Sequence, residues 1–265
     1  MATDSYYRFS GYARYFQEAP HDGNDSFSEG TSFETILDIY QADAAIRYRL
    51  SRQLTAVELM LRTKVAKVIA EEYSPYGNYL EDSFYLATCD RVVESCLRDI
   101  SRSREPYILR YKEEQSSTGE MYSTLPIWSA VQAFSFGTLS KIIERGANGN
   151  LHARLASEIG LAQRGFSSRV KALVYLRNRC AHHSRLWNHS VIDAGATPNN
   201  VRGRAKRLVG QFDPRSIADI VASLDDIYLR CDLGKPVLNE LHQEFCGVPS
   251  LWAGYTRPLS PRNHR

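Results

Sequence analysis

In the stretch Thr31-Ser-Phe-Glu-Thr-Ile-Leu-Asp-Ile-Tyr40, two signals of an α-helix coincide. Thr31 is followed three residues later by Glu34, and this spacing forms a capping box at the start of a helix. Apolar residues then recur at the spacing of one helix face, namely Phe33, Ile36, Leu37 and Tyr40. We therefore expect an amphipathic helix that begins near Thr31 and buries this face.

Helical periodicity also dominates the rest of the chain. Leu125-Pro126 opens one such segment, because proline suits the first turn of a helix, and we expect Ile127, Trp128, Val131 and Phe134 to face inward. Asp213-Pro214 opens another, with Asp213 as the N-cap. Further helices are predicted for residues 55–73, 92–100, 151–159, 167–183 and 237–245. Strand patterns are scarce, so the sequence predicts an all-α bundle.

Turn-forming residues predict three loops, which are Ala19 to Gly30, Ser116 to Thr124, and His189 to Gly203. We expect one domain over residues 1–245, since the chain is long enough to bury a full core. Residues 246–265 contain three prolines and no periodicity, which predicts an extended or partly disordered tail. Trp252 and Tyr255 are the side chains through which this tail would dock onto the bundle.

Composition narrows the class of protein. No apolar run approaches the roughly 18 residues needed to cross a bilayer, and the polar start Met-Ala-Thr-Asp-Ser is unlike a signal peptide. We therefore expect a cytoplasmic protein without membrane contact. The five cysteines contain no Cys-x-x-Cys pair, so we expect reduced thiols and no zinc ribbon; they are Cys89, Cys96, Cys180, Cys231 and Cys246.

Positive charge is concentrated in one part of the chain. Residues 164–207 hold ten Lys and Arg against one acid, Asp193. A phosphate-binding face requires such an excess, because each neutralised phosphate adds affinity that does not depend on sequence. For Val201-Arg-Gly-Arg-Ala-Lys-Arg207, the alternative to a phosphate-binding face is a solvated basic loop, and the sequence supports the two interpretations equally.

The basic stretch contains Leu173-Val-Tyr-Leu-Arg-Asn-Arg-Cys-Ala-His-His-Ser-Arg-Leu-Trp-Asn188. Within it, Arg177, Asn178 and His182 place a permanent cation, an amide and an imidazole on two turns of one predicted helix. These groups are able to bind a phosphodiester and to transfer a proton. The combination indicates a site that cleaves RNA without a metal ion.

This segment resembles the Abi-like (abortive infection) family, a branch of the HEPN ribonuclease superfamily whose signature is an Arg, four to six residues and a His. Three other segments agree with that family in order, namely Tyr6–Tyr12, Gly30–Tyr40 running on to Val57–Arg62, and Leu125–Val131 followed by Ser135–Ser140. The resemblance implies a HEPN-like helical bundle with additional helices and a role in phage defence or as a toxin. Members usually carry a longer segment before the first of these motifs, which leaves open any partner contact made there.

The residue types suggest a role for each group. His182 would act as general base on the ribose 2′-OH, because imidazole titrates near neutral pH. Arg177 would stabilise the charge on the scissile phosphate, and Asn178 would orient His182 or donate to a phosphate oxygen. We expect no cofactor, and products that carry a 2′,3′-cyclic phosphate or 3′-phosphate and a 5′-OH. The alternative for His182 is a hydrogen-bonded core histidine.

Helix geometry favours a homodimer. Arg177 lies roughly 140° around an α-helix from His182, so the two do not converge unless the helix ends there or the long Arg side chain bends around. Two copies facing across a twofold axis would bring both pairs into one cleft, and the family resemblance implies the same composite site.

Other polar residues complete the predicted site. For RNA binding we expect Arg179, His183, Arg185, Arg202, Arg204, Lys206 and Arg207, although Arg179 and His183 also suit a surface or dimer contact. Glu58 and Arg62 are four residues apart, which predicts a structural ion pair; the alternative is a contact that orients Arg177 or His182. Cys180 with His182 and His183 fits no common zinc site.

Two further functions stay open on the sequence alone. One is a catalytically silent module that binds RNA or protein with the same fold, although intact Arg177, Asn178 and His182 favour an enzyme. The other is an acceptor of nucleotidyl groups in a toxin and antitoxin pair. The sequence names neither the RNA target, nor a trigger, nor a partner such as an antitoxin or a guide or other non-coding RNA.

Overall fold

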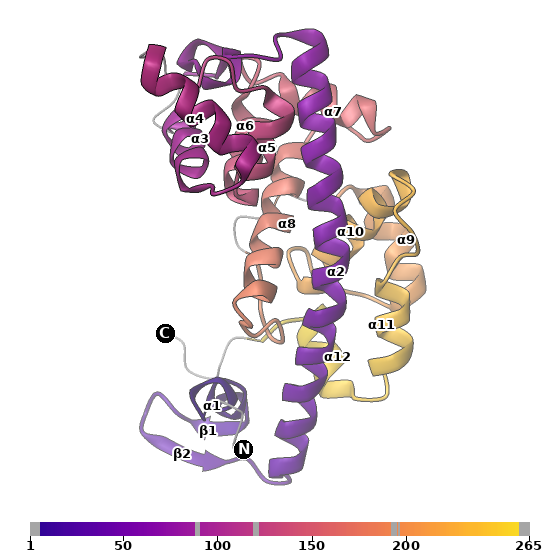
Figure 1. Ribbon diagram of the computed structural model, residues 1–265. Helices are drawn as coiled ribbons and strands as arrows, with labels where there is room; N and C mark the ends of the chain where they lie inside the picture. The colour runs from indigo at the N-terminus through magenta and orange to yellow at the C-terminus, as the bar shows by residue number, and fades with distance from the viewer. Residues whose placement is uncertain (1–5, 88–90, 119–121, 192–194, 196, 260–265) are drawn as a thin grey trace. The chain divides into compact units, whose positions relative to one another are not determined.

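The computed structural model describes residues 6–87, 91–118, 122–191, 195 and 197–259, with side chains for all of these except residues 113–118. Over this part of the chain the fold is all-α, as predicted (Figure 1). The helices are α1 (Tyr6–Ala13), α2 (Phe33–Glu72), α3 (Val92–Arg102), α4 (Pro106–Thr118), α5 (Ile127–Ala133), α6 (Phe136–Arg145), α7 (Leu151–Glu158), α8 (Phe166–Ala181), α9 (Asn199–Val209), α10 (Ile217–Arg230), α11 (Leu238–Phe245) and α12 (Pro249–Thr256). Three short 3-10 helices are η1 (Arg14–Phe16), η2 (Asn78–Leu80) and η3 (Asp82–Phe84).

The chain forms two compact units, each of which is described by itself. Unit 1 comprises residues 1–54, 175–229 and 234–265, and unit 2 comprises residues 55–174 and 230–233. The first part of helix α2 therefore belongs to unit 1 and its second part to unit 2. Helix α8 is also divided, with its first part in unit 2 and its last part in unit 1. The predicted motif belongs to unit 1.

Helix α2 is one continuous helix of 40 residues, where the sequence predicted two (Figure 1). Ile46, Leu50 and Leu54 are buried and continue the inward stripe across the predicted gap. At the start, the Ser32 hydroxyl accepts from the backbone N–H of Thr35 at 3.1 Å, so Ser32 caps the helix instead of Thr31. Phe33 then lies on the exposed side, contrary to the prediction.

Each unit has its own apolar core. In unit 1 the core consists of the α2 stripe and further buried residues that include Leu176, Leu186, Ile220, Leu224, Leu241 and Leu251. In unit 2 the core includes Val65, Ile69, Phe134, Leu139, Ile142, Phe166 and Leu173. Trp128 is 50% exposed and was wrongly assigned to this core, because the buried face of α5 consists of Ile127, Ala130 and Val131.

Several predicted loops contain regular structure. The Ala19–Gly30 loop is the turn and second strand of an antiparallel hairpin between β1 (Gln17–Ala19) and β2 (Asn24–Phe27). The 189–203 loop ends early, because α9 begins at Asn199 and buries Val201, Ala205 and Val209 along one face. Residues 192–194 and 196 of that loop, and 119–121 of the 116–124 loop, lie outside the described residues.

Helix α10 and the predicted tail also differ from the prediction. Helix α10 begins at Ile217, and the Ser216 hydroxyl accepts from the Asp219 N–H at 3.2 Å. Arg215 has a φ of 65°, which interrupts the helix that was expected to begin at Asp213. Residues 249–256, which were expected to lie in an extended or partly disordered tail, instead form α12, which has Pro249 in its first turn and buries Leu251 and Tyr255. Residues 260–265 lie outside the described residues.

Candidate active site

Helix α8 carries the predicted motif and ends inside it. Ser184 N–H donates to the Arg179 carbonyl at 2.8 Å, and His183 N–H donates to the Cys180 carbonyl at 3.1 Å. This pair of bonds is a Schellman motif, in which His183 takes the left-handed position with a φ of 53°. His182 is therefore the C-cap of α8, and the helix ends about two residues before the predicted boundary.

The three predicted catalytic side chains lie at this helix end. Asn178 and His182 are exposed, and Arg177 is half-buried. The Arg177 guanidinium donates to Asn178 Oδ1 at 3.3 Å, so the Asn178 side-chain oxygen is a hydrogen-bond acceptor for Arg177. The backbone N–H of His182 donates to the Asn178 carbonyl at 2.9 Å. The exposed imidazole is unlike the core histidine that was the alternative, and it is accessible to a ligand from solvent.

A buried carboxylate that the sequence analysis missed holds the segment after the motif. Asp43 is fully buried on α2 and accepts from the backbone N–H groups of Leu186 at 3.2 Å and Trp187 at 2.9 Å. Arg47 and the hydroxyls of Tyr12 and Tyr255 donate to the same carboxylate. Asp43 therefore joins α1, α2, α12 and the chain that follows His182.

Aromatic rings surround the same segment. Trp187 stacks on Tyr12 and Phe16, with ring centroids 6.0 and 5.8 Å apart, and Tyr15 meets its edge at 5.1 Å. The Trp187 indole N–H donates to the Ser250 carbonyl at 2.9 Å. Gly254 of α12 lies so close that a Cβ there would overlap this indole. The predicted tail is thus part of the packing behind the motif, and Tyr255 docks as expected.

Arg185 and Arg179 are held by this framework. Arg185 lies over the Tyr15 ring, 4.5 Å from its centroid, and donates to the Trp187 carbonyl at 2.7 Å. Arg179 donates through Nε to the Arg185 carbonyl at 3.1 Å and lies 5.8 Å from the Tyr175 ring centroid. Both cations therefore have structural contacts that fix their positions beside the motif, and their predicted RNA contacts stay a prediction.

The four basic residues of α9 differ from one another. Arg202 makes a two-point ion pair with the buried Asp219, at 3.0 and 3.2 Å. Arg204 is 52% exposed and pairs with Asp226 at 2.9 Å. Lys206 lies 5.3 Å from the Phe212 ring centroid, and Arg207 is exposed. Arg202 therefore has a structural role, because its guanidinium neutralises a carboxylate of α10, and its predicted RNA contact stays a prediction.

This difference predicts that two substitutions on α9 have different effects on stability and on RNA binding. Arg202→Ala should lower the free energy of unfolding by about 3 kcal/mol, because it leaves the Asp219 carboxylate buried without its partner. Arg207→Ala should change stability by less than about 0.5 kcal/mol and should flatten the slope of log affinity for single-stranded RNA against log salt by roughly 0.7 if Arg207 meets a phosphate. Urea unfolding and salt titrations of RNA binding would measure both effects. Equal stability of the two variants would contradict the structural role of Arg202.

Glu58 and Arg62 lie in unit 2 and form the predicted ion pair, at 2.5 Å. Both side chains are buried, and Arg62 also donates to the Val131 carbonyl of α5. These contacts give the pair a structural role within its own unit. The alternative, an orienting contact to Arg177 or His182, stays a prediction.

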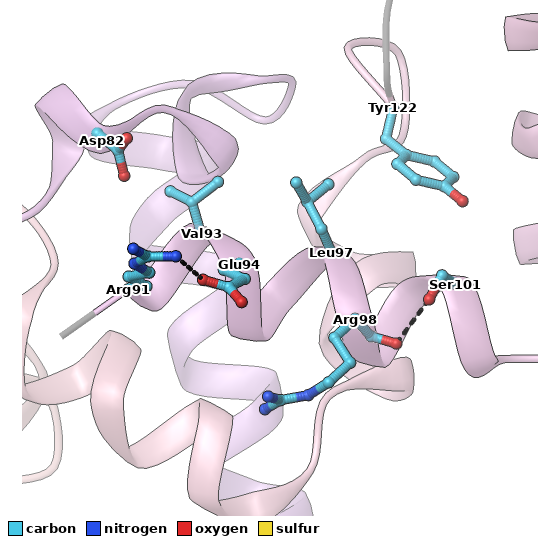
Figure 2. A pocket seen from close by; sticks show the side chains of 8 residues that line it. All are labelled: Asp82, Arg91, Val93, Glu94, Leu97, Arg98, Ser101 and Tyr122. Atoms are coloured by element: carbon cyan, nitrogen blue, oxygen red, sulfur yellow. Dashed lines mark hydrogen bonds and ion pairs between the residues drawn. The ribbon is translucent and has the colours of Figure 1, made fainter.

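An open cleft of about 700 Å³ lies in unit 2, beside α3 (Figure 2). Val93 and Leu97 line it together with four charged residues, namely Asp82, Arg91, Glu94 and Arg98. Arg91 pairs with Glu94 at 3.2 Å, and Arg98 lies 3.9 Å from Asp99. Both arginines thus have carboxylate partners, and the cleft is not a concentrated cationic site.

A smaller cavity of about 190 Å³ lies in unit 1 between α9, α10 and α11, lined mainly by apolar residues such as Val201, Leu208 and Leu229. Asp225 lies at its edge and accepts from the N–H groups of Val237 and Leu238, at 2.9 Å each. Burial raises the pKa of Asp225 to about 6. Its two backbone bonds show that this carboxylate fixes the start of α11.

The described residues contain no group of three or more His, Cys, Asp or Glu side chains placed to hold a metal ion. Cys180, which stands between the motif residues, is buried, and burial raises the pKa of its thiol to about 12. Cys96, Cys231 and Cys246 are also free thiols, whereas Cys89 lies outside the described residues. Within the same residues, none of the helices has both the length and the apolar character that crossing a membrane requires.

Comparisons with known proteins give one match. No curated protein and no solved structure matches the chain. The model of the Abi-like protein family matches residues 1–188, a span that includes Asp43, the motif at the end of α8, and Trp187. Since the match covers well over half of the 265 residues, the chain belongs to the Abi-like protein family.

Proposed function

We propose that this protein is a HEPN-type endoribonuclease that cleaves RNA without a metal ion and acts in abortive infection or as a toxin. The observation that carries the proposal is the placement of Arg177, Asn178 and His182 at the exposed end of α8. Membership of the Abi-like family supports the link to abortive infection. The concentration of Lys and Arg around the motif suits an anionic substrate.

The proposed chemistry follows from the three side chains. The neutral His182 imidazole takes the proton of a ribose 2′-OH, and the oxygen attacks the adjacent phosphorus. Arg177 donates to the non-bridging oxygens, where negative charge accumulates in the transition state. The bond from phosphorus to the 5′-oxygen breaks, and this oxygen takes a proton from a second, protonated imidazole. The products carry a 2′,3′-cyclic phosphate and a 5′-OH, and DNA is not a substrate because it lacks the nucleophile.

The second imidazole is a reason to propose a dimer with a shared site. Because His182 is the C-cap of α8 and is exposed, a second copy facing this helix end across a twofold axis would supply its own His182 and Arg177. One imidazole would then act as base and the other as acid. The exposed Asn178 amide would donate to the same phosphate.

A shared site predicts that an inactive variant lowers the activity of the wild type. A mixed dimer of wild type and His182→Ala has one imidazole where the proposed mechanism uses two, so wild type refolded together with His182→Ala should cleave RNA more slowly than the same amount of wild type refolded alone. Native mass spectrometry would confirm that mixed dimers are present. A rate equal to that of the wild type alone, in a preparation that contains mixed dimers, would rule out the shared site.

The function itself is tested by incubating the purified protein with labelled total RNA in EDTA and sequencing the cut ends. We expect discrete cuts whose upstream fragments end in a 2′,3′-cyclic phosphate or 3′-phosphate and whose downstream fragments begin with a 5′-OH. RNA that stays intact under a range of conditions, although the protein binds it, would favour the silent binding module instead.

A further inference from the structure

A cluster of three side chains lies beside the motif. Tyr175 of α8 and His189 lie with their rings nearly parallel, 6° apart, and their centroids are separated by 5.6 Å. A hydrogen bond of 2.6 Å joins the Tyr175 hydroxyl and His189 Nε2. Arg179 donates to the same hydroxyl at 3.4 Å. The two rings are thus fixed in a common orientation.

Tyr175 lies on the same face of α8 as Asn178 and His182. Tyr175, Asn178 and His182 are spaced three and four residues apart, which places them on one side of a helix. The seven residues from Tyr175 to His182 correspond to roughly 10 Å along the helix axis. That distance is suited to a nucleotide close to the scissile phosphate. Tyr175 remains 38% exposed, so part of its ring is open to a ligand.

The charge around the cluster favours an anionic chain. Arg179 and Arg185 are both close enough to affect His189, whose pKa is lowered to about 4 by burial and by these two cations. At neutral pH the imidazole is therefore uncharged and serves as a flat ring. Nearby cations also favour the phosphates of a strand whose base stacks on the rings.

We propose that Tyr175, with its ring orientation fixed by His189 and Arg179, is a stacking site for one unpaired base of a single-stranded RNA. The inference deepens the proposed function, on which it rests for the identity of the ligand as RNA. Stacking on an aromatic ring accepts any base, because every base has a π-face. The site would therefore set the register of the strand on α8 without selecting a sequence.

Binding of an uncleavable RNA tests the site separately from catalysis. The probe is a ten-nucleotide RNA with a 2′-O-methyl group at every position, which removes the nucleophile, and fluorescence anisotropy measures its affinity. Tyr175→Ala should weaken binding roughly tenfold, the usual effect of losing one stacked base. Tyr175→Phe retains the ring and should bind nearly as well as the wild type. Tyr48→Ala, at an 82% exposed tyrosine of α2, controls for the loss of a surface aromatic.

An abasic scan of the same probe identifies the stacked base. Removing the base at one position should weaken binding to the wild type roughly tenfold and should not weaken binding to Tyr175→Ala further. Identical scans for the two proteins, or equal losses for Tyr175→Phe and Tyr175→Ala, would overturn the stacking site, as would a wild type that does not bind the probe. Base-dependent binding without any RNA cleavage would instead overturn the nuclease and leave the stacking site standing.

Discussion

Replacing His182 with alanine is expected to leave a folded protein that cleaves RNA at least about a hundredfold more slowly, because proton transfer by a positioned side chain contributes at least that factor. The fold should survive, since the imidazole is exposed and the Schellman bonds at the end of α8 involve only backbone atoms. Arg177→Ala should cause a loss of similar size by removing charge stabilisation in the transition state. Initial cleavage rates and circular dichroism would measure activity and fold.

Conservative variants separate chemistry from packing. Arg177→Lys retains the charge but not the forked set of donors, so its rate should lie between those of the wild type and Arg177→Ala. His182→Asn retains a polar side chain but has no imidazole to take up the proton, so it should be as inactive as His182→Ala. His21→Asn changes another exposed histidine, in the turn between β1 and β2, and should retain the wild-type rate. Full activity of a folded His182→Asn variant would end the catalytic assignment.

The second large effect is expected at Asp43. Asp43→Asn should lower the free energy of unfolding by about 3 to 5 kcal/mol, because it leaves the buried Arg47 without its ion-pair partner. The new amide also places an N–H group where Tyr12, Tyr255 and two backbone N–H groups donate. Urea unfolding followed by circular dichroism would measure the loss.

Three further variants distinguish the ion pair from its neighbours. Tyr12→Phe and Tyr255→Phe each remove one hydroxyl from the carboxylate and should cost about 1 to 2 kcal/mol. Adding Arg47→Gln to Asp43→Asn should recover part of the stability, since no unpaired charge then remains buried. Asp43→Asn with the stability of the wild type would show that the carboxylate does not hold the segment after the motif.

The sequence predicted the fold class and most helices because apolar residues recur at helical spacing. It divided α2 into two helices because Asp43 and Arg47 lie on the inward stripe and interrupt its apolar pattern. The structure shows why they are tolerated there: they pair with each other, and Asp43 also accepts from four further donors. A buried ion pair of this kind depends on α1 and α12, which are distant in sequence.

In the basic stretch of the candidate site, too, contacts with residues distant in sequence could not be predicted. Counting charges between residues 164 and 207 grouped Arg202 and Arg204 with Arg207. Their partners, Asp219 and Asp226, lie on α10, beyond the end of the counted stretch. The spacing of Val201, Ala205 and Val209 by four residues was the local signal that this stretch forms a helix. The spacing of seven residues between Tyr175 and His182 was enough to place Tyr175 on the same helix face as His182. The contact of Tyr175 with His189 could not be predicted from the sequence, because it depends on the fold.

The role of the ribose 2′-OH as nucleophile is tested with an RNA oligonucleotide that carries one 2′-deoxy nucleotide at a mapped cut site. In EDTA the protein should cut the all-ribose strand at this bond and leave the substituted bond intact, while neighbouring sites are cut as before, because the missing 2′-OH is the nucleophile. Cleavage of the substituted bond at the rate of the all-ribose bond would overturn the proposed function, since the attacking group would then be water and not the ribose.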